Sequence, residues 1–182
     1  MENTTATAVK TKWVLDAAHS ELLFKVKHLM ISNVKGEFKN FAAEINGEDL
    51  ETSTVKATID SASIYTNNED RDNHLKSADF FDVEKHNEIT FVSTSFKKEK
   101  ADNYSLTGKL TIKGVSKEIT LQVEFGGINK DPWGNEKAGF SITGKINRKD
   151  WGLNWNAALE TGGVLVSEEV QIIGEVQFLK AK

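Results

Sequence analysis

The sequence predicts an all-β protein whose antiparallel strands close into a barrel, and three observations support this. Apolar and polar residues alternate with a period of two through most of the chain, as in strands that bury one face. Short turn signals such as Asn46-Gly47 and Lys113-Gly114 separate the alternating segments. Glycines inside those segments suit the bends of a curved sheet better than a flat one; they are Gly36, Gly108, Gly144 and Gly174.

The folded part of the chain is expected to begin near Trp13. Residues 1–11 are polar, rich in Thr and Ala, and without periodicity. They are therefore predicted to form a flexible tail in front of one barrel domain that covers residues 12–182. The first clear alternation follows in residues 22–28, whose predicted inward face carries Leu22, Phe24, Val26 and His28.

The same alternation recurs along the rest of the chain and predicts at least seven strands in all. The later segments are 55–59, 89–91, 106–112, 119–125, 140–146 and 170–178. Between the first two segments the apolar set shifts by an odd step, from Val34 and Phe38 to Phe41, Ala43 and Ile45. An odd step turns side chains to the other face, so a bulge is predicted near Asn40.

Residues 67–82 interrupt the strand pattern. They contain no β-branched residue, Asn67 is a plausible helix cap, and acidic residues occupy the first turns, where the helix dipole favours them. A short helix is therefore predicted around residues 68–77. Phe80 and Phe81 follow directly, and two adjacent aromatic residues after a polar helix suggest a plug packed against a barrel mouth.

The composition excludes several classes of function. A net charge of −4 over 182 residues provides no basic field for nucleic acid. The absence of cysteine excludes disulfides, thiolate nucleophiles and cysteine-bound zinc. No apolar run approaches the length of about 18 residues that a membrane helix needs. The first residues lack the features of a signal peptide, so the chain as given is expected to be cytoplasmic, or periplasmic if a signal was removed.

Eight short motifs carry a resemblance to a known family, the YceI-like family, over about residues 13–180. They are DAAHS at 16–20, FKVKH at 24–28, GEF at 36–38, RDNHL at 71–75, DFFD at 79–82, ITF at 89–91, GKLTIKGV at 108–115 and NRKDWGL at 147–153. The resemblance implies an extended, eight-stranded, lipocalin-like antiparallel barrel whose lumen holds a polyisoprenoid chain. It further implies a frequent homodimer and no accepted catalytic activity, so the protein is predicted not to be an enzyme.

The sharpest polar cluster consists of Arg71, Asp72 and His74. On a helix Arg71 and His74 share a face, so they could hold the polar head of a ligand at the barrel mouth. Alternatively they tie the helix to the barrel rim, and this interpretation is favoured because charged pairs on helices are commonly structural.

Arg148 and Asp150 present the same choice between a site and a buried ion pair. Burial of either charge without a partner would be costly, and Asp72 and Asp79 are possible partners across the barrel. A structural role is again favoured.

No metal site, cofactor or catalytic residue is predicted. The histidines at 19, 28, 74 and 86 do not follow the spacing of zinc ligands. The sequence also lacks a nucleophile elbow, a phosphate-binding glycine loop and a dinucleotide fingerprint.

The apolar residues carry the functional prediction. An eight-stranded barrel is either filled by side chains or holds one small ligand. Small residues on bulky faces (Ala57, Gly108, Gly144 and Gly174) are expected to leave space, and the resemblance also favours a cavity. The predicted ligand contacts are Leu22, Phe24, Val26, His28, Phe38, Ile59, His74, Phe80, Phe81, Phe91, Leu110, Leu121, Val123, Phe140, Ile142, Ile172 and Val176.

The predicted function is binding, storage or transport of a long apolar isoprenoid-type lipid, such as a polyprenyl or isoprenoid-quinone-like molecule. Two alternatives stay open: an enzyme that acts on a lipid or quinone at the mouth through Arg71, His74 or Asp150, and a stress-related scaffold protein without a ligand. Tryptophans 133, 151 and 155 lie in or near predicted loops, where packing is their default role.

Overall fold

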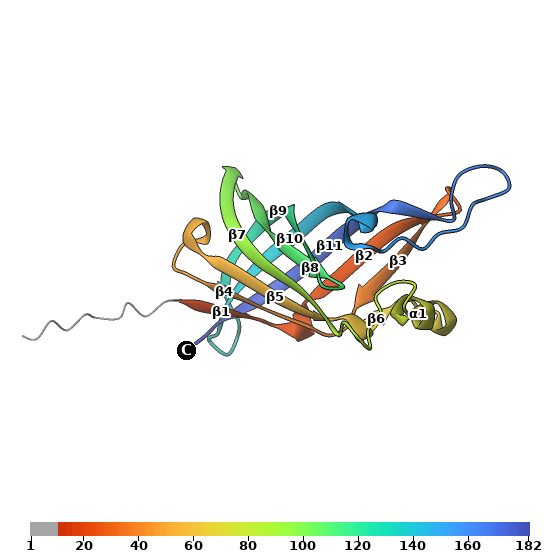
Figure 1. Cartoon of the computed structure of the whole chain (residues 1–182). Coiled ribbons are helices and arrows are strands. Elements are labelled where there is room, and N and C mark those ends of the chain that lie inside the picture. The colour runs from red at the N-terminus through yellow and green to blue at the C-terminus, as the bar shows by residue number, and fades with distance from the viewer. Residues whose placement is uncertain (1–10) are drawn as a thin grey trace, which may run out of the picture.

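The computed structural model describes residues 11–182 and has the predicted architecture, a closed antiparallel β-barrel with one short α-helix (Figure 1). The tail predicted for the start of the chain falls on residues 1–10, which lie outside the described residues.

Eight long strands form the barrel wall, and three of them are interrupted. The interrupted strands are β1 (Lys12–Leu15) with β2 (Glu21–His28), β3 (Ser32–Phe38) with β4 (Phe41–Asn46), and β5 (Thr54–Asp60) with β6 (Ile64–Tyr65). The continuous strands are β7 (Glu88–Lys100), β8 (Asn103–Ile112), β9 (Val115–Lys130), β10 (Glu136–Asn147) and β11 (Val166–Lys180). The prediction of an eight-stranded barrel is therefore confirmed.

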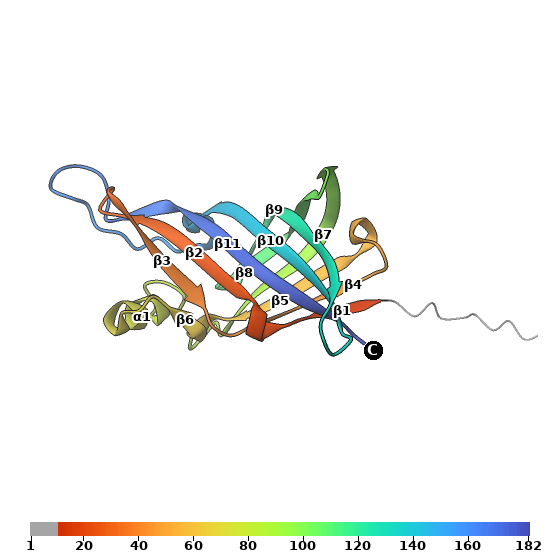
Figure 2. The same cartoon turned by 180° about the vertical axis from the view of Figure 1, so that it is seen from behind.

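Each strand pairs with the next along the chain, and β11 returns to pair with both β1 and β2. Trp13 lies opposite Lys180 where the barrel closes. Seen from behind, β3, β2, β11, β10 and β9 run side by side as one continuous wall (Figure 2). β1 and the C-terminus lie at one end of this elongated barrel, and α1 lies at the other (Figure 1).

The interruptions of neighbouring strands are bonded to each other. The break between β3 and β4 falls at Lys39 and Asn40, where the sequence predicts a bulge. The Lys39 amide donates to the Ser63 carbonyl, and the Asp60 amide donates to the Asn40 carbonyl, at 3.1 and 3.0 Å. Ser63 ends the 3₁₀ turn η3 (Ser61–Ser63) between β5 and β6, so both strands bend at the same level. A similar turn, η1 (Ala17–His19), separates β1 from β2.

The predicted helix is present as α1 (Glu69–Lys76). Its cap is Asn68 rather than Asn67, because the Asn68 side chain accepts a hydrogen bond from the Arg71 amide and Asn67 has a positive φ of 59°. Among the described residues, no helix is long and apolar enough to cross a bilayer.

One stretch of the barrel wall lacks strand pairing. β6 is only two residues long and pairs with β3 alone, whereas β7 starts at Glu88 and pairs with β5 and β8. Helix α1 and residues 77–87 lie between β6 and β7 in sequence and cover this side of the barrel (Figure 1). The segment that joins β6 to β7 therefore also covers the gap in strand pairing between these two strands.

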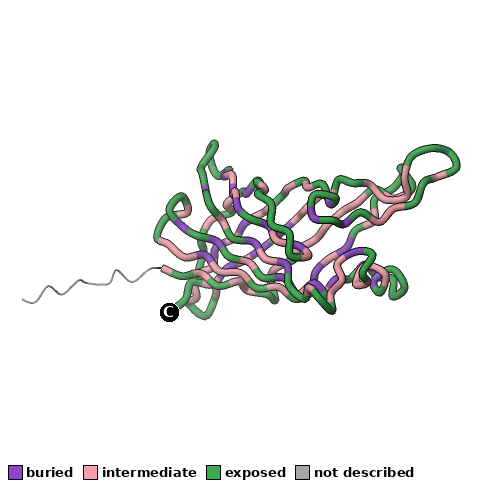
Figure 3. The backbone as a smooth tube through the Cα atoms, viewed as in Figure 1, coloured by how far each residue is buried: buried purple, intermediate pink, exposed green. Residues whose placement is uncertain are grey.

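The interior divides into two regions, which we call the packed half and the cavity half. In the packed half, toward β1 and the C-terminus, inward aromatic side chains of neighbouring strands pack against one another. Phe140 lies 5.2 Å from Phe125 and 5.8 Å from Phe178 between ring centroids, and Phe96 lies 5.4 Å from Tyr104. Buried residues recur along these strands, and the loops are exposed (Figure 3). The cavity half lies toward α1 and is described below.

The small residues do not create empty space, contrary to the expectation for Ala57, Gly108, Gly144 and Gly174, because none of them lines the cavity. A β-carbon on Gly108 would lie 2.5 Å from the Val92 carbonyl oxygen and 2.6 Å from Cζ of Phe91. Glycine thus admits a neighbouring ring and backbone, and the space is already filled.

Candidate ligand-binding cavity

A cavity of about 470 Å³ occupies the half of the barrel next to α1. This volume falls within the roughly 300–1,000 Å³ usual for small-molecule sites. Strands β2, β3, β5, β7, β8, β10 and β11 contribute residues to its walls, and α1, the segment after α1 and the loop between β10 and β11 cover it. Its lining is almost entirely apolar, so it suits a ligand that is itself largely hydrocarbon.

Eleven of the predicted ligand contacts line this cavity. They come from five strands, α1 and the segment behind it, and they are Leu22, Phe24, Val26, His28, Phe38, Ile59, His74, Phe80, Phe81, Leu110 and Ile172. Their contact with a ligand stays a prediction, but the fold brings them around one space.

Six other predicted contacts lie outside the cavity. Phe91, Leu121, Val123, Phe140 and Val176 are buried, and Ile142 is half-buried against the same core. These side chains point inward as the alternation predicts, but they pack against one another and leave no space for a ligand.

Sequence reasoning also missed part of the lining. Some of the missed residues continue the inward faces of strands, namely Val34, Ile89, Ile112, Ile146, Val166 and Val170. Others come from irregular segments where no periodicity could identify them, namely Leu153, Trp155 and Leu165. Five of the first group already lie on the alternating faces identified from the sequence, which do not show which end of each strand borders the cavity; only Val166 required extending an alternation to its strand end.

Aromatic rings cover the cavity between α1 and the loop that follows η4 (Arg148–Trp151). The ring of His74 lies edge-on to Trp155 and to Phe80, with centroids 4.7 and 5.1 Å apart, and Phe80 lies 5.4 Å from Trp155. His74 Nε2 also lies 2.9 Å from an Asp79 carboxylate oxygen on the exposed side. The plug predicted from Phe80 and Phe81 is thus observed, and Trp155 completes it.

The favoured interpretation predicts that Arg71 and His74 tie the helix to the rim of the barrel, and the structure shows this for Arg71, with Asp72 as its companion. Arg71 donates from Nε to Thr66 Oγ1 at 2.8 Å and from a terminal nitrogen to the Thr66 carbonyl at 2.6 Å. The buried Asp72 carboxylate accepts from the Thr66 amide and hydroxyl. Both side chains therefore hold α1 against the residue that follows β6.

Arg148 contradicts the expected ion pair with Asp72, Asp79 or Asp150. It is only 3% exposed, and no carboxylate among the described residues lies within ion-pair distance of it. Instead it donates to the carbonyls of Ser167, Leu153 and Trp155 at 2.6–2.9 Å, and more weakly to that of Val166. Burial lowers the pKa of the guanidinium, and only Glu168 opposes this from a distance.

These carbonyls belong to the two ends of the loop between η4 and β11, so Arg148 fixes that loop over the cavity. Trp151 helps from the same turn, because its buried indole donates to the Leu110 carbonyl at 2.9 Å. Asp150 is exposed and does not line the cavity.

The few charged groups in the lining include more cations than anions. Arg71 and Arg148 are cations and Asp70 is the one carboxylate among the residues that line the described cavity. His28 and His74 add groups that can donate hydrogen bonds, whereas the Thr66 hydroxyl already donates to Asp72 and Arg148 already donates to backbone carbonyls. The lining therefore offers positive charge and a few donors, those of Arg71 and the two histidines, to the polar end of a ligand.

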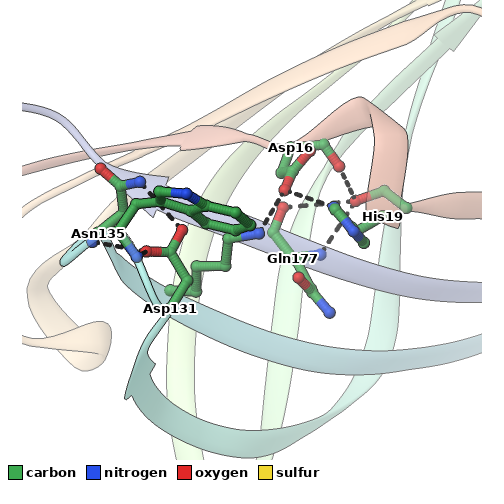
Figure 4. Close-up of polar contacts among 8 residues, drawn as sticks. Asp16, His19, Asp131, Asn135 and Gln177 are labelled. Atoms are coloured by element: carbon green, nitrogen blue, oxygen red, sulfur yellow. Dashed lines mark hydrogen bonds and ion pairs between the residues drawn. The ribbon is translucent and has the colours of Figure 1, made fainter.

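A second polar network lies away from the cavity, where β1 gives way to β2 (Figure 4). The Asp16 carboxylate accepts from Lys137 Nζ at 2.9 Å and lies 2.8 Å from His19 Nδ1, and the Ser20 hydroxyl bonds Gln177 of β11. The hydrogen bond from Lys137 lowers the pKa of Asp16. This motif fastens the strand break to β10 and β11.

The same view shows Asp131 closing the turn between β9 and β10 (Figure 4). It accepts from the amides of Trp133 and Asn135, both at 2.9 Å. Within residues 11–182, no group of three or more histidine and acidic side chains is placed to hold a metal ion.

Comparison with known proteins agrees with this fold. The model of the YceI-like domain matches residues 13–178. A UPF0312 protein of Staphylococcus aureus (strain MSSA476) is 46% identical over 171 residues, which cover 92% of this chain and 97% of the relative. The crystal structure of a YceI protein from Campylobacter jejuni is 38% identical with a TM-score of 0.74, covering 86% of this chain and 90% of that one.

A more distant structure shares the fold alone. It is a polyisoprenoid-binding domain from Saccharophagus degradans, which is 13% identical with a TM-score of 0.68 and covers 93% of this chain and 98% of that one. The family model matches residues 13–178, and the staphylococcal relative is 46% identical. The chain therefore belongs to the YceI-like family.

Proposed function

We propose that this protein binds a long isoprenoid-type lipid in the cavity half of the barrel and stores or carries it. The observation that carries this proposal is the apolar cavity of about 470 Å³, enclosed by strands, α1 and an aromatic cover. A structural neighbour described as a polyisoprenoid-binding domain supports the choice of ligand class.

The tail of the lipid provides most of the binding free energy under this proposal. Each Å² of apolar area removed from water contributes about 25 cal/mol, so every added isoprene unit strengthens binding until the cavity is full. Affinity therefore rises with chain length and then levels off.

The head group is expected near the polar part of the lining. Arg71, His74 and Asp70 come from the cover on the solvent side, and Arg148 adds a buried cation. A head group with acceptor oxygens, such as the carbonyls of a quinone or the hydroxyl or phosphate of a polyprenyl chain, fits a lining of donors.

Organic extraction of the protein from its native host, followed by mass spectrometry, tests the proposal. We expect an isoprenoid that leaves with the protein and is retained through native mass spectrometry. Titration of the emptied protein with isoprenoids of increasing length should give the predicted rise in affinity. Extraction of no apolar molecule, together with no binding of any isoprenoid offered, would refute the proposal.

Extraction of the lipid after long incubation with the protein separates binding from catalysis. If His74→Ala abolished turnover of a bound quinone or polyprenyl lipid while the lipid stayed bound, the protein would be a lipid-modifying enzyme. Under the proposal, the lipid extracted after long incubation is unchanged. We also propose a homodimer, which light scattering on the purified protein tests.

A further inference from the structure

The turn between β2 and β3 exposes three large apolar residues in a row. Leu29, Met30 and Ile31 are 40, 54 and 82% exposed. The turn projects from the end of the barrel that carries α1, beside the loop between η4 and β11 (Figures 1 and 2). The Leu29 amide donates to the carbonyl of Leu165, a cavity-lining residue, at 2.9 Å.

This apolar tip is continuous with the cavity wall. Val26 and His28 of β2 and Val34 of β3 line the cavity directly below the turn. A surface that covered the tip would therefore lie against the same end of the barrel through which a lipid would enter.

Folding alone does not account for the residues in the turn. Leu29 and Met30 both have positive φ, 53° and 63°, in a three-residue turn, and Asn and Gly adopt such angles more readily than bulky apolar residues do. The turn between β8 and β9 has similar angles, 52° and 74°, and uses Lys113 and Gly114. Two bulky apolar residues that are both strained and exposed to solvent indicate a binding surface, where burial against a partner would offset these costs.

The outer face of the same hairpin is basic. Lys25, Lys27 and Lys35 lie on it, and Lys25 is directly opposite Lys35, a pairing that repels. None of the three forms an ion pair with any of the described residues. Residues 25–35 contain no acidic residue, although the chain as a whole carries a net charge of −4.

Acidic groups on the neighbouring elements lie close to other partners or farther from the tip. On β11, Glu168 and Glu169 pair with Lys149 and Lys145. Glu37 lies at the far end of β3, opposite Leu23, and Glu160 is exposed in the loop before β11. Glu21 begins β2 and Glu37 lies near the end of β3, so the uncompensated positive charge is confined to the stretch from Lys25 through the turn to Lys35.

We propose that this hairpin docks the barrel on an anionic bilayer. The side chains of residues 29–31 enter the boundary between head groups and acyl chains, and the three lysines contact anionic head groups. The purpose of docking, lipid exchange with the bilayer, rests on the proposed function. Docking itself does not, because it needs no molecule in the cavity.

Flotation of the full chain with vesicles tests the proposal. We expect binding to vesicles of phosphatidylcholine and phosphatidylglycerol in equal amounts, weak binding to phosphatidylcholine alone, and loss of binding at high salt. The vesicles contain no isoprenoid, so a protein that docks but yields no isoprenoid on extraction would retain this inference and lose the proposed function.

The double variant Leu29→Asn/Met30→Gly separates the tip from folding, because Asn and Gly suit the positive φ of both positions and the variant should fold at least as stably. We expect binding to fall tenfold or more while the melting temperature holds or rises. Trp133→Ser is the matched control, since Trp133 is 83% exposed in the turn between β9 and β10 at the other end. Unchanged binding by the double variant, or an equal loss with Trp133→Ser, would overturn the proposal.

Charge is tested with Lys25→Gln/Lys27→Gln/Lys35→Gln. Each lysine lost should weaken binding to anionic vesicles about fivefold. The same charge is removed at the far end of β7 by Lys97→Gln/Lys98→Gln/Lys100→Gln, which should bind like the wild type. An equal loss in both triple variants would mean that net charge, not the hairpin, drives binding.

A spectroscopic readout is simple because the chain has no cysteine. A fluorophore on Ile31→Cys should shift its emission to the blue with anionic vesicles, whereas one on Lys98→Cys should not. If the tip instead covers a second copy of the chain, the shift would appear on concentrating the protein without vesicles, and docking would be wrong.

Discussion

The packed half and the cavity half of the barrel share the same strands and the same alternation, but they differ in what closes them. In the packed half the strands are hydrogen-bonded around the barrel, and rings such as Phe140 and Phe178 pack against each other from neighbouring strands. In the cavity half, β6 and β7 are not hydrogen-bonded to each other, and α1 with the segment that follows it covers the gap between them. Paired strands bring their inward side chains into contact, so the missing pairing between β6 and β7 leaves room for the cavity.

The largest expected effect compares one phenylalanine from each half. Phe140→Ala should destabilise the protein by about 3–5 kcal/mol, because Phe140 is buried between two other rings. Phe81→Ala should cost only about 1–2 kcal/mol, since that ring already faces the cavity and loses fewer contacts. Chemical denaturation measures both, and equal costs would remove the distinction between the halves.

Lipid affinity should respond in the opposite order. Phe81→Ala is expected to weaken binding of an isoprenoid by removing part of the wall. Phe140→Ala should leave affinity unchanged at temperatures where the variant is folded.

The next effect tests whether the strand glycines provide space or close contact. Gly108→Ala should destabilise by about 1–3 kcal/mol, because its β-carbon meets the Val92 carbonyl and the Phe91 ring. Gly139→Ala is the control, since a β-carbon there meets nothing within 4 Å. Thermal unfolding of both variants measures the two changes in stability. If Gly108→Ala were as stable as the wild type, this glycine would leave free space after all.

Filling the cavity should reduce binding without unfolding the barrel. Ile172 lines the cavity, and Ile172→Trp is expected to weaken binding of the longest isoprenoid about tenfold, or ~1.4 kcal/mol. The neighbouring Ile173 does not line the cavity, so Ile173→Trp controls for the added bulk. Isothermal titration with chains of several lengths should show the greatest loss for the longest chain, and equal losses in both variants would argue against a bound tail.

The smallest effect concerns acid stability at the break between β1 and β2. The pKa of Asp16 is lowered in the folded state, chiefly by Lys137, so its contribution is present above its ordinary pKa of 3.8 and is lost as the pH falls through the lowered value. Lys137→Met should cost about 1 kcal/mol or less at neutral pH and should reduce the loss of stability in acid. NMR titration of the Asp16 carboxyl checks this, and an unchanged pKa in the variant would exclude Lys137 as the cause.

The sequence predicts the wall of the barrel better than its interior. Alternation and turn residues are local signals, so the strands, the helix and the break near Asn40 can be located from the chain alone. Phe91 and Phe38 carry the same inward signal, yet Phe91 is packed and Phe38 lines the cavity. What separates them is which strand or loop lies across the barrel, and no local pattern encodes this.

Arg148 shows the same limit for a polar residue. A carboxylate partner was the natural expectation, because acidic side chains are visible in a sequence. Its actual partners are backbone carbonyls at both ends of a loop, and every residue has a carbonyl. Only the path of that loop reveals why the arginine can be buried.

The seam between β1 and β11 has a consequence for how the protein is made. Trp13 meets Lys180 there, and Phe24, a wall residue of the cavity, meets Ile172 on the same final strand. Contacts between strands so far apart in sequence form slowly, because a long loop must close first. During synthesis β11 emerges after all the other strands, so the barrel stays an open sheet until β11 has left the ribosome and paired with β1 and β2. Under the proposed function, a lipid would be enclosed only after that pairing.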